Sequence, residues 1–161
     1  LKGQFYYHFK GKEGLYFALI DMLLTRKQAF LAERMTPADL EGDIFTLFRS
    51  WTHHGVAFAR AEPAISRFSE SLAGEQGSPI YEKIMQRYNF EENDFMSQLI
   101  EGAFARGEFR EDLPLPFIKR TVGYFFTHVA QIADLHEATK FEENLHYLIE
   151  FMKSGLSRST E

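Results

Sequence analysis

The sequence predicts an all-α fold, and three observations support this class. Apolar residues recur at spacings of three and four along most of the chain, whereas the alternation typical of strands is scarce. Apolar residues make up 45% of the 161 residues, which is enough to bury a sizeable core in one domain. Proline, glycine and helix-capping residues separate the periodic segments. We therefore expect about six long or medium helices after a short helical segment at the start of the chain.

Breaks in the apolar pattern divide the first half of the chain into predicted helices. Gly11 is an acceptable N-cap for the first of them, and Thr36 caps a new start with Pro37 at the first helical position. Pro63 ends the next helix, because the residue before a proline avoids the helical conformation. The expected helices span residues 12–35, 40–61 and 64–72.

The second half is expected to contain three more helices. Gly107 is a natural C-cap for the first, and polar residues at 91–94 interrupt its apolar face, where a kink is expected. The segment from residue 154 to the end is expected to fray. These helices span residues 79–106, 116–137 and 141–156.

The composition excludes several classes of protein. The chain has no cysteine, which rules out disulfides and thiolate metal sites and fits a reducing cytoplasm. It has no apolar run long enough to span a membrane and no secretory signal pattern. His53 and His54 are adjacent, and adjacent helical side chains point in different directions, so they cannot easily share an ion. We therefore expect a cytoplasmic protein without a metal or cofactor.

Charge is distributed unevenly along the chain. The net charge is −5, which by itself argues against nucleic acid. Residues 1–12, however, contain Lys2, Lys10 and Lys12 and no acid, so the remainder carries a net charge of −8. Basic segments gain affinity for polyanions through counterion release, whereas an acidic body is repelled by them. A short cationic head on an acidic body is therefore compatible with nucleic-acid binding.

The opening stretch, which contains "FYYHF", has the composition of a contact surface. If residues 1–8 continue as a helix, Phe5 and Phe9 share one face and can be buried together. The other faces are cationic, aromatic and rich in donors that can reach phosphates and base edges. Gly3 would allow the backbone to approach closely. The alternative is a solvated helix end with a few core aromatics.

The order of residues in this stretch resembles the recognition-helix signature of the TetR family of bacterial transcriptional regulators. The resemblance covers only the opening of the chain, but its spacing is specific. The matching residues are Lys2, Gly3, Tyr6, His8, Phe9, Lys12 and Leu15.

The resemblance implies a DNA-binding head with a helix-turn-helix, followed by a helical body that binds a small ligand and forms a homodimer. Residues 1–11 would be the end of the head, and residues 12–161 the body. The two preceding helices would then lie before Leu1, so we expect the chain beginning there not to bind an operator specifically. The residues expected to contact DNA are Lys2, Gly3, Gln4, Tyr6, Tyr7, His8 and Lys12.

Aromatic stripes interrupted by polar rings are candidates for the walls of a ligand pocket. Small-molecule pockets are mostly apolar with a few convergent polar groups, and the resemblance implies such a pocket in the body. Plain core packing is the alternative for any single position. The ligand is expected to be lipophilic or aromatic. The candidate wall residues are Trp51, His54, Phe58, Phe68, Tyr88, Phe125 and His128.

The last two predicted helices have more apolar surface than one core needs. In the final helix, Tyr147 and Phe151 lie away from the main apolar stripe, and in the helix before it Phe126 and Ala130 form a second apolar face. These surplus faces fit the four-helix dimer interface that the resemblance implies. We therefore expect a homodimer through these helices, with a monomer that buries both as the alternative.

Taken together, these patterns predict a ligand-responsive transcriptional regulator. The resemblance favours a repressor that a small lipophilic or aromatic molecule releases from operator DNA. An enzyme is not expected, because no Ser-His-Asp order, metal-ligand spacing or phosphate loop stands out. The alternative is a helical small-molecule-binding dimer with no role on DNA.

Overall fold

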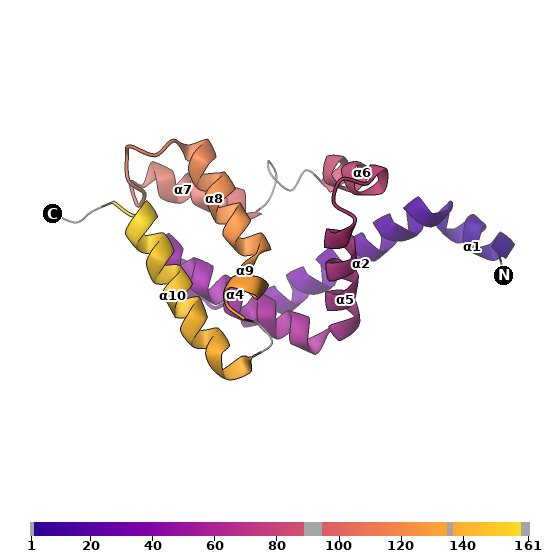
Figure 1. Cartoon of the computed structure of the whole chain (residues 1–161), viewed down its shortest axis with the longest axis horizontal. Coiled ribbons are helices and arrows are strands. Elements are labelled where there is room, and N and C mark those ends of the chain that lie inside the picture. The colour runs from indigo at the N-terminus through magenta and orange to yellow at the C-terminus, as the bar shows by residue number, and fades with distance from the viewer. Residues whose placement is uncertain (1, 89–94, 135–136, 159–161) are drawn as a thin grey trace. The chain divides into compact units, whose positions relative to one another are not determined.

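The computed structural model is helical throughout its regular elements, which confirms the all-α prediction (Figure 1). It describes residues 2–88, 95–134 and 137–158, without the side chains of Lys2, Phe5, Tyr6, Phe9, Ala138 and Thr139. None of the described helices is long and apolar enough to cross a membrane. The helices are α1 (Lys2–Phe9), α2 (Lys12–Arg34), α3 (Pro37–Glu41), α4 (Ile44–Ala61), α5 (Pro63–Gly74), α6 (Pro79–Tyr88), α7 (Phe95–Ala105), α8 (Leu115–Thr127), α9 (Val129–Ile132) and α10 (Ala138–Leu156).

The chain divides into two compact units. Unit 1 contains α1, α2, the end of α4 from Ala57, α5 and α6. Unit 2 contains α3, the first part of α4 up to Val56, and α7 to α10. The sequence predicts a different division, between a DNA-binding segment that ends at residue 11 and a ligand-binding and dimerisation body that begins at residue 12. That division remains a prediction.

Unit 2 contains a contiguous hydrophobic core. Its largest side chains are Phe48 of α4, Phe109 and Phe141, all fully buried. The ring of Phe48 packs edge to face against Phe126 of α8, with centroids 5.2 Å apart. The buried members of the core are Ile44, Phe45, Leu47, Phe48, Val56, Met96, Ile100, Ala103, Phe109, Ile118, Val122, Ala133, Phe141, Leu145, Leu148, Ile149, Met152 and Leu156.

Unit 1 is held together differently. Few of its described apolar side chains are fully buried, and aromatic rings and ion pairs join α2 to α5 and α6. The Tyr16 and Phe68 rings lie 5.9 Å apart, and Lys83 of α6 pairs with Glu13 of α2 at 2.8 Å. Its buried apolar residues are Ile20, Leu31, Phe58, Ile65 and Ile84.

Two of the predicted helix boundaries are confirmed in atomic detail. Thr36 is the N-cap of α3, with Pro37 at the first helical position, and its N–H and hydroxyl both donate to the Asp39 carboxylate, at 2.7 and 2.8 Å. Gly107 follows α7 with φ +75°, and the N–H groups of Gly107 and Glu108 donate to the carbonyls of Phe104 and Ala103. This paired arrangement satisfies carbonyls at the helix end that would otherwise have no partner.

The joint between α1 and α2 consists of two residues in the left-handed region. Lys10 has φ +50° and Gly11 has φ +94°. The Gly11 carbonyl accepts the first hydrogen bond of α2, from Leu15 N at 3.2 Å. Glycine adopts this conformation without steric cost, whereas a lysine there is uncommon.

The prediction of one helix over residues 40–61 is wrong at its start. Leu40 belongs to the short helix α3, and α4 begins at Ile44. The reason is Asp43, whose carboxylate accepts hydrogen bonds from the N–H and hydroxyl of Thr46 at 2.7 and 2.9 Å. An aspartate in this geometry caps a new helix instead of continuing the preceding one.

The prediction of one helix over residues 116–137 is also wrong, because α8 ends at Thr127 and α9 begins at Val129. The backbone of His128 leaves the helical region, with φ −106° and ψ +9°. Its Nδ1 lies 2.9 Å from the Tyr124 carbonyl oxygen, and the Thr127 hydroxyl donates to the Gly123 carbonyl. Such side-chain hydrogen bonds compete with the helical ladder.

Two further boundaries differ from the prediction or lie beyond what the structure describes. The last helix begins at Ala138, ahead of the predicted start at residue 141. Within the predicted helix 79–106, α6 and α7 are both helical, but the expected kink at residues 91–94 lies outside the described residues.

Candidate functional site

The predicted DNA-contacting residues lie on α1 and at the first position of α2. The ring of Tyr7 is 84% exposed and stands edge-on to His8, with centroids 5.7 Å apart. The side chains of Lys2 and Tyr6 lie outside the described part, as do those of the expected buried pair on the opposite face. The described members of the set are all exposed: Gly3, Gln4, Tyr7, His8 and Lys12.

The electrostatics of this end of unit 1 favour an anionic partner. Helix α1 has no acidic residue, and Lys10 and Lys12 follow it directly. The Lys12 ammonium lies 5.7 Å from the centroid of the Tyr16 ring, a cation–π distance that restrains the side chain without neutralising it. The arrangement can offer aromatic, imidazole and ammonium groups to one partner.

The seven predicted pocket residues are divided between the two units. Four of them belong to unit 2, namely Trp51, His54, Phe125 and His128. The other three belong to unit 1, where each ring packs against an aromatic ring of α2. These contacts are Phe58 with Phe30 at 5.4 Å, Phe68 with Tyr16 at 5.9 Å, and Tyr88 with Phe17 at 6.4 Å.

Tyr88 has an evident structural role in fixing α6 to α2. Its hydroxyl lies 2.6 Å from the Asp21 carboxylate and 3.1 Å from the Phe17 carbonyl oxygen. Burial and the neighbouring Asp21 raise the pKa of Tyr88 to about 12. The Arg87 guanidinium lies 4.6 Å from the Phe17 ring centroid beside it. These contacts keep the phenol protonated and engaged with α2.

In unit 2, the predicted residues also have partners of their own. Trp51 lies against Phe95 with ring centroids 5.6 Å apart, and His128 stacks on Tyr124 at 4.0 Å. Phe125 contacts Phe151 and lines a hollow of only about 10 Å³. A space of that size holds about one water molecule, so this hollow is too small for an organic ligand.

The adjacent histidines of α4 have different neighbours. His53 Nδ1 lies 2.8 Å from a carboxylate oxygen of Glu142 on α10, and the His53 and His54 rings meet edge to face. Among the described residues, no group of three or more histidine and acidic side chains is placed to hold a metal ion.

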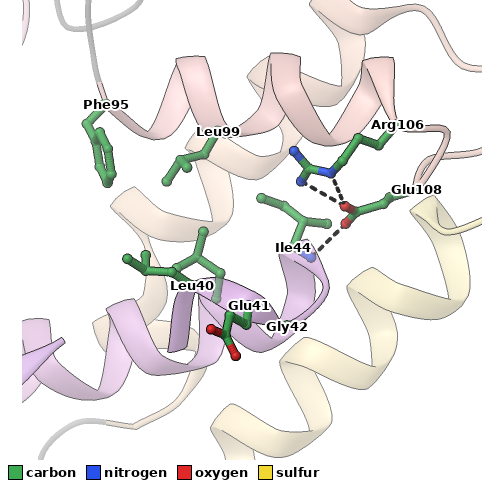
Figure 2. Close-up of a pocket in the computed structure, with 9 residues that line it drawn as sticks. Leu40, Glu41, Gly42, Ile44, Phe95, Leu99, Arg106 and Glu108 are labelled. Atoms are coloured by element: carbon green, nitrogen blue, oxygen red, sulfur yellow. Dashed lines mark hydrogen bonds and ion pairs between the residues drawn. The ribbon is translucent and has the colours of Figure 1, made fainter. Parts of the chain in front are cut away.

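A cavity of about 420 Å³ lies elsewhere in unit 2, between α3, the start of α4, α7 and the turn after α7 (Figure 2). Its volume falls in the range of small-molecule sites. Leu40 on one side faces Phe95 and Leu99 on the other, so the walls are largely apolar (Figure 2). The lining residues are Leu40, Glu41, Gly42, Ile44, Leu47, Phe95, Leu99, Arg106 and Glu108.

One end of this cavity is polar and tightly organised. The Nε and Nη2 atoms of Arg106 both lie 2.8 Å from Oε1 of Glu108 (Figure 2). The other carboxylate oxygen of Glu108 accepts a hydrogen bond from the N–H of Ile44, also at 2.8 Å. Glu108 therefore caps the first turn of α4 while it holds the guanidinium at the cavity.

None of the seven sequence-predicted pocket residues lines this cavity, although Trp51 contacts it through Phe95. Sequence reasoning missed the lining because its two halves, residues 40–47 and 95–108, are far apart in the chain. The sequence holds two local signals near it, although neither identifies a cavity. Leu40 is an apolar residue in a short segment that follows the Thr36 cap, and charged residues flank Gly107 on both sides.

The fold is similar to that of a TetR family transcriptional regulator from Chloroflexus aurantiacus J-10-FL, known from a crystal structure at 2.56 Å resolution. The TM-score is 0.73, and the match covers 99% of this chain and 79% of that chain at 19% sequence identity. No family model matches the sequence, and no curated protein matches it either. The chain therefore has a TetR-like fold.

Proposed function

We propose that this protein is a ligand-responsive transcriptional regulator. The observation that supports the proposal is a helix α1 without acidic residues, whose described side chains are exposed and which carries the recognition-helix signature on a chain with a TetR-like fold. In this proposal residues 1–11 contact DNA, and residues 12–161 form the ligand-binding and dimerisation body, which acts in the cytoplasm without catalysing a reaction.

Helix α1 would bind in the major groove, where its side chains reach base edges and phosphates. Tyr7 and His8 are exposed and adjacent, so they can contact bases or backbone together. Lys12 lies past the joint with α2 and would contact a phosphate, gaining affinity through counterion release. The acidic remainder of the chain would be repelled by the duplex, so that α1 is the part turned towards it.

The ligand would regulate DNA binding by favouring one of two states of the protein. A ligand can shift such an equilibrium only by its difference in affinity for the two states. The cavity of unit 2 is the site that we propose for a lipophilic or aromatic ligand that releases a repressor. The seven aromatic and histidine positions that the sequence nominated remain a prediction.

A second copy of the chain would cover the exposed apolar surface of α8, α9 and α10. Phe151 of α10 is 67% exposed and packs edge to face with Phe125 of α8 at 6.0 Å, so the two helices share this surface. Isolated exposed apolar residues are ordinary, but a contiguous group typically marks an interface. The large exposed apolar residues here are Phe117, Tyr124, Ile132, Tyr147 and Phe151.

Phe151→Glu is expected to convert a dimer into a monomer, because it places a charge on the apolar surface that the second copy would cover. Light scattering coupled to size-exclusion chromatography measures the mass directly. Arg49→Glu, at an exposed position of α4, introduces the same residue elsewhere and should leave the mass unchanged. A wild-type chain that is monomeric at micromolar concentration would refute the dimer.

DNA binding is tested on the full reading frame that encodes this chain, with a binding site selected from a random duplex library. Tyr7→Ala is expected to weaken the free energy of binding to the selected site by about 1–3 kcal/mol.

Lys12→Ala should lower the affinity for all DNA sequences alike and reduce the salt dependence of binding by about one phosphate contact. Arg49→Ala is the control for loss of an exposed cation on α4. If the library yields no preferred sequence, the helical ligand-binding dimer without a DNA role is the better description.

A further inference from the structure

The polar end of the unit 2 cavity has donor capacity that the protein does not use. Arg106 directs Nε and Nη2 at Glu108, but Nη1 has no hydrogen-bond partner among the described residues. Glu108, by contrast, has donors on both carboxylate oxygens, from Arg106 and from the N–H of Ile44. A guest molecule at this end therefore meets free N–H donors and a carboxylate that is already engaged.

The guanidinium of Arg106 lies close to a position that has no side chain. Gly102 lies one turn before Arg106 on α7, and a Cβ placed there would be 3.2 Å from Nη1. The guanidinium can therefore extend along the same side of α7 as Leu99 and Phe95. These two residues line the apolar part of the cavity (Figure 2). The free donor is thus placed at the end of an apolar stripe.

The charge at this end is balanced before any ligand arrives. Arg106 and Glu108 form an ion pair, and the remaining acidic lining residue, Glu41, directs its carboxylate away from Phe95 and Leu99 (Figure 2). A charged head group would lose part of its hydration at this end without meeting an unpaired opposite charge, a cost that the 61% exposure of the Arg106 side chain keeps modest. A neutral acceptor would gain a hydrogen bond from a charged donor without that cost.

We propose that this cavity binds a neutral, elongated apolar molecule with a carbonyl oxygen at one end. The carbonyl accepts from Nη1 of Arg106, and the apolar chain lies between Leu40 on one wall and Leu99 and Phe95 on the other. This inference rests on the proposed role of unit 2 as a ligand sensor and specifies the chemical class of the ligand.

The chain contains its own reporter for the test. Trp51 is the only tryptophan, and its ring lies 5.6 Å from that of Phe95, which lines the cavity. Titration of tryptophan fluorescence with 2-nonanone, nonanoate and nonylamine compares neutral, anionic and cationic heads on matched chains. The wild-type protein should bind 2-nonanone about tenfold more tightly than either charged probe.

Arg106→Met removes the donors at nearly constant length and leaves Glu108 without its counter-charge. We expect the affinity for 2-nonanone to fall about tenfold and that for nonylamine to rise, so that the order of the two probes reverses. Binding of nonylamine also shows that the variant is folded with its cavity intact. Arg49→Met, at an exposed position of α4 outside the lining, should preserve the wild-type order.

The possible failures have different meanings. If the wild-type protein binds nonanoate as tightly as 2-nonanone, or if Arg106→Met keeps the wild-type order, the carbonyl proposal is wrong although the cavity remains a ligand site. If no probe changes the fluorescence or the melting temperature, the cavity is not a sensor site, and that part of the proposed function fails as well. DNA binding by α1 is measured independently and is unaffected by either result.

Discussion

The two units of the molecule are stabilised by different interactions. Unit 2 surrounds Phe48, Phe109 and Phe141, which are fully buried in one contiguous apolar core. Unit 1 depends more on aromatic edges and on polar contacts between α2 and its neighbours, such as Tyr88 with Asp21 and Arg26 with Glu62. Exposed ion pairs contribute little free energy each, whereas buried apolar area contributes in proportion to its extent.

This difference in packing suggests that the two units have different roles. Elements that move or open are drawn from the less stable parts of a protein, since opening costs least there. Unit 1 carries α1, the proposed contact with DNA, and unit 2 carries the proposed ligand cavity. A well-packed unit 2 joined to a more adjustable unit 1 would allow a ligand to act on unit 1 without unfolding the core of unit 2.

The largest expected effect tests the core of unit 2. Phe48→Ala should lower the free energy of unfolding by about 3–5 kcal/mol, because it leaves a cavity among Phe45 and Phe126. Phe68→Ala in unit 1 removes a half-buried ring and should cost about 1–2 kcal/mol. Urea denaturation followed by circular dichroism measures both. Equal losses would remove the contrast between the units.

A smaller effect is expected for the polar contact that fixes α6. Tyr88→Phe removes the hydroxyl that bonds to Asp21 and should cost about 1 kcal/mol. Amide hydrogen exchange should accelerate in α6 and the facing part of α2, with α7 to α10 unchanged. Acceleration throughout both units would show that they unfold as a single cooperative body.

The smallest effect is a pH dependence of unit 2. Hydrogen bonds from Ser50 first, and then from the backbone and hydroxyl of Thr36, lower the pKa of Asp39 from 3.8 to about 2. Because the folded state favours the carboxylate, this contribution is complete above the unfolded pKa and is lost as pH falls from 3.8 towards 2. In the Asp39→Asn variant, the free energy of unfolding should therefore depend less on pH between 3.8 and 2 than in the wild type. The same slope in variant and wild type would contradict this origin.

Much of the fold could be predicted because local chemistry sets it. The Thr36–Pro37 start and the Gly107 end follow from residue types that favour one backbone conformation. The break at His128 could not be predicted, since it depends on side chains competing for the Tyr124 and Gly123 carbonyls. Periodicity alone gives the same pattern for one long helix and for two short ones.

The candidate sites differ in the same way. The exposure of Tyr7 and His8 on α1 was predictable from the opening residues, since the pattern that predicts it is contained in one short segment. The cavity was not, because Leu40 and Leu99 come from segments that only the tertiary fold brings together. None of the aromatic and histidine positions that the sequence indicated lines this cavity, and rings such as Phe58 and Phe68 pack against α2.

The paired left-handed residues Lys10 and Gly11 form a bend at the junction of α1 and α2. An eight-residue helix is about 12 Å long, so a tilt of about 10° in α2 would carry the far tip of α1 through about 2 Å. That distance is comparable to the gap between a hydrogen bond made and one broken. Helix α1 therefore acts as a lever arm on α2. A mutation that made the Lys10–Gly11 junction flexible would stop movements of α2 from being transmitted to α1, although both helices would stay folded.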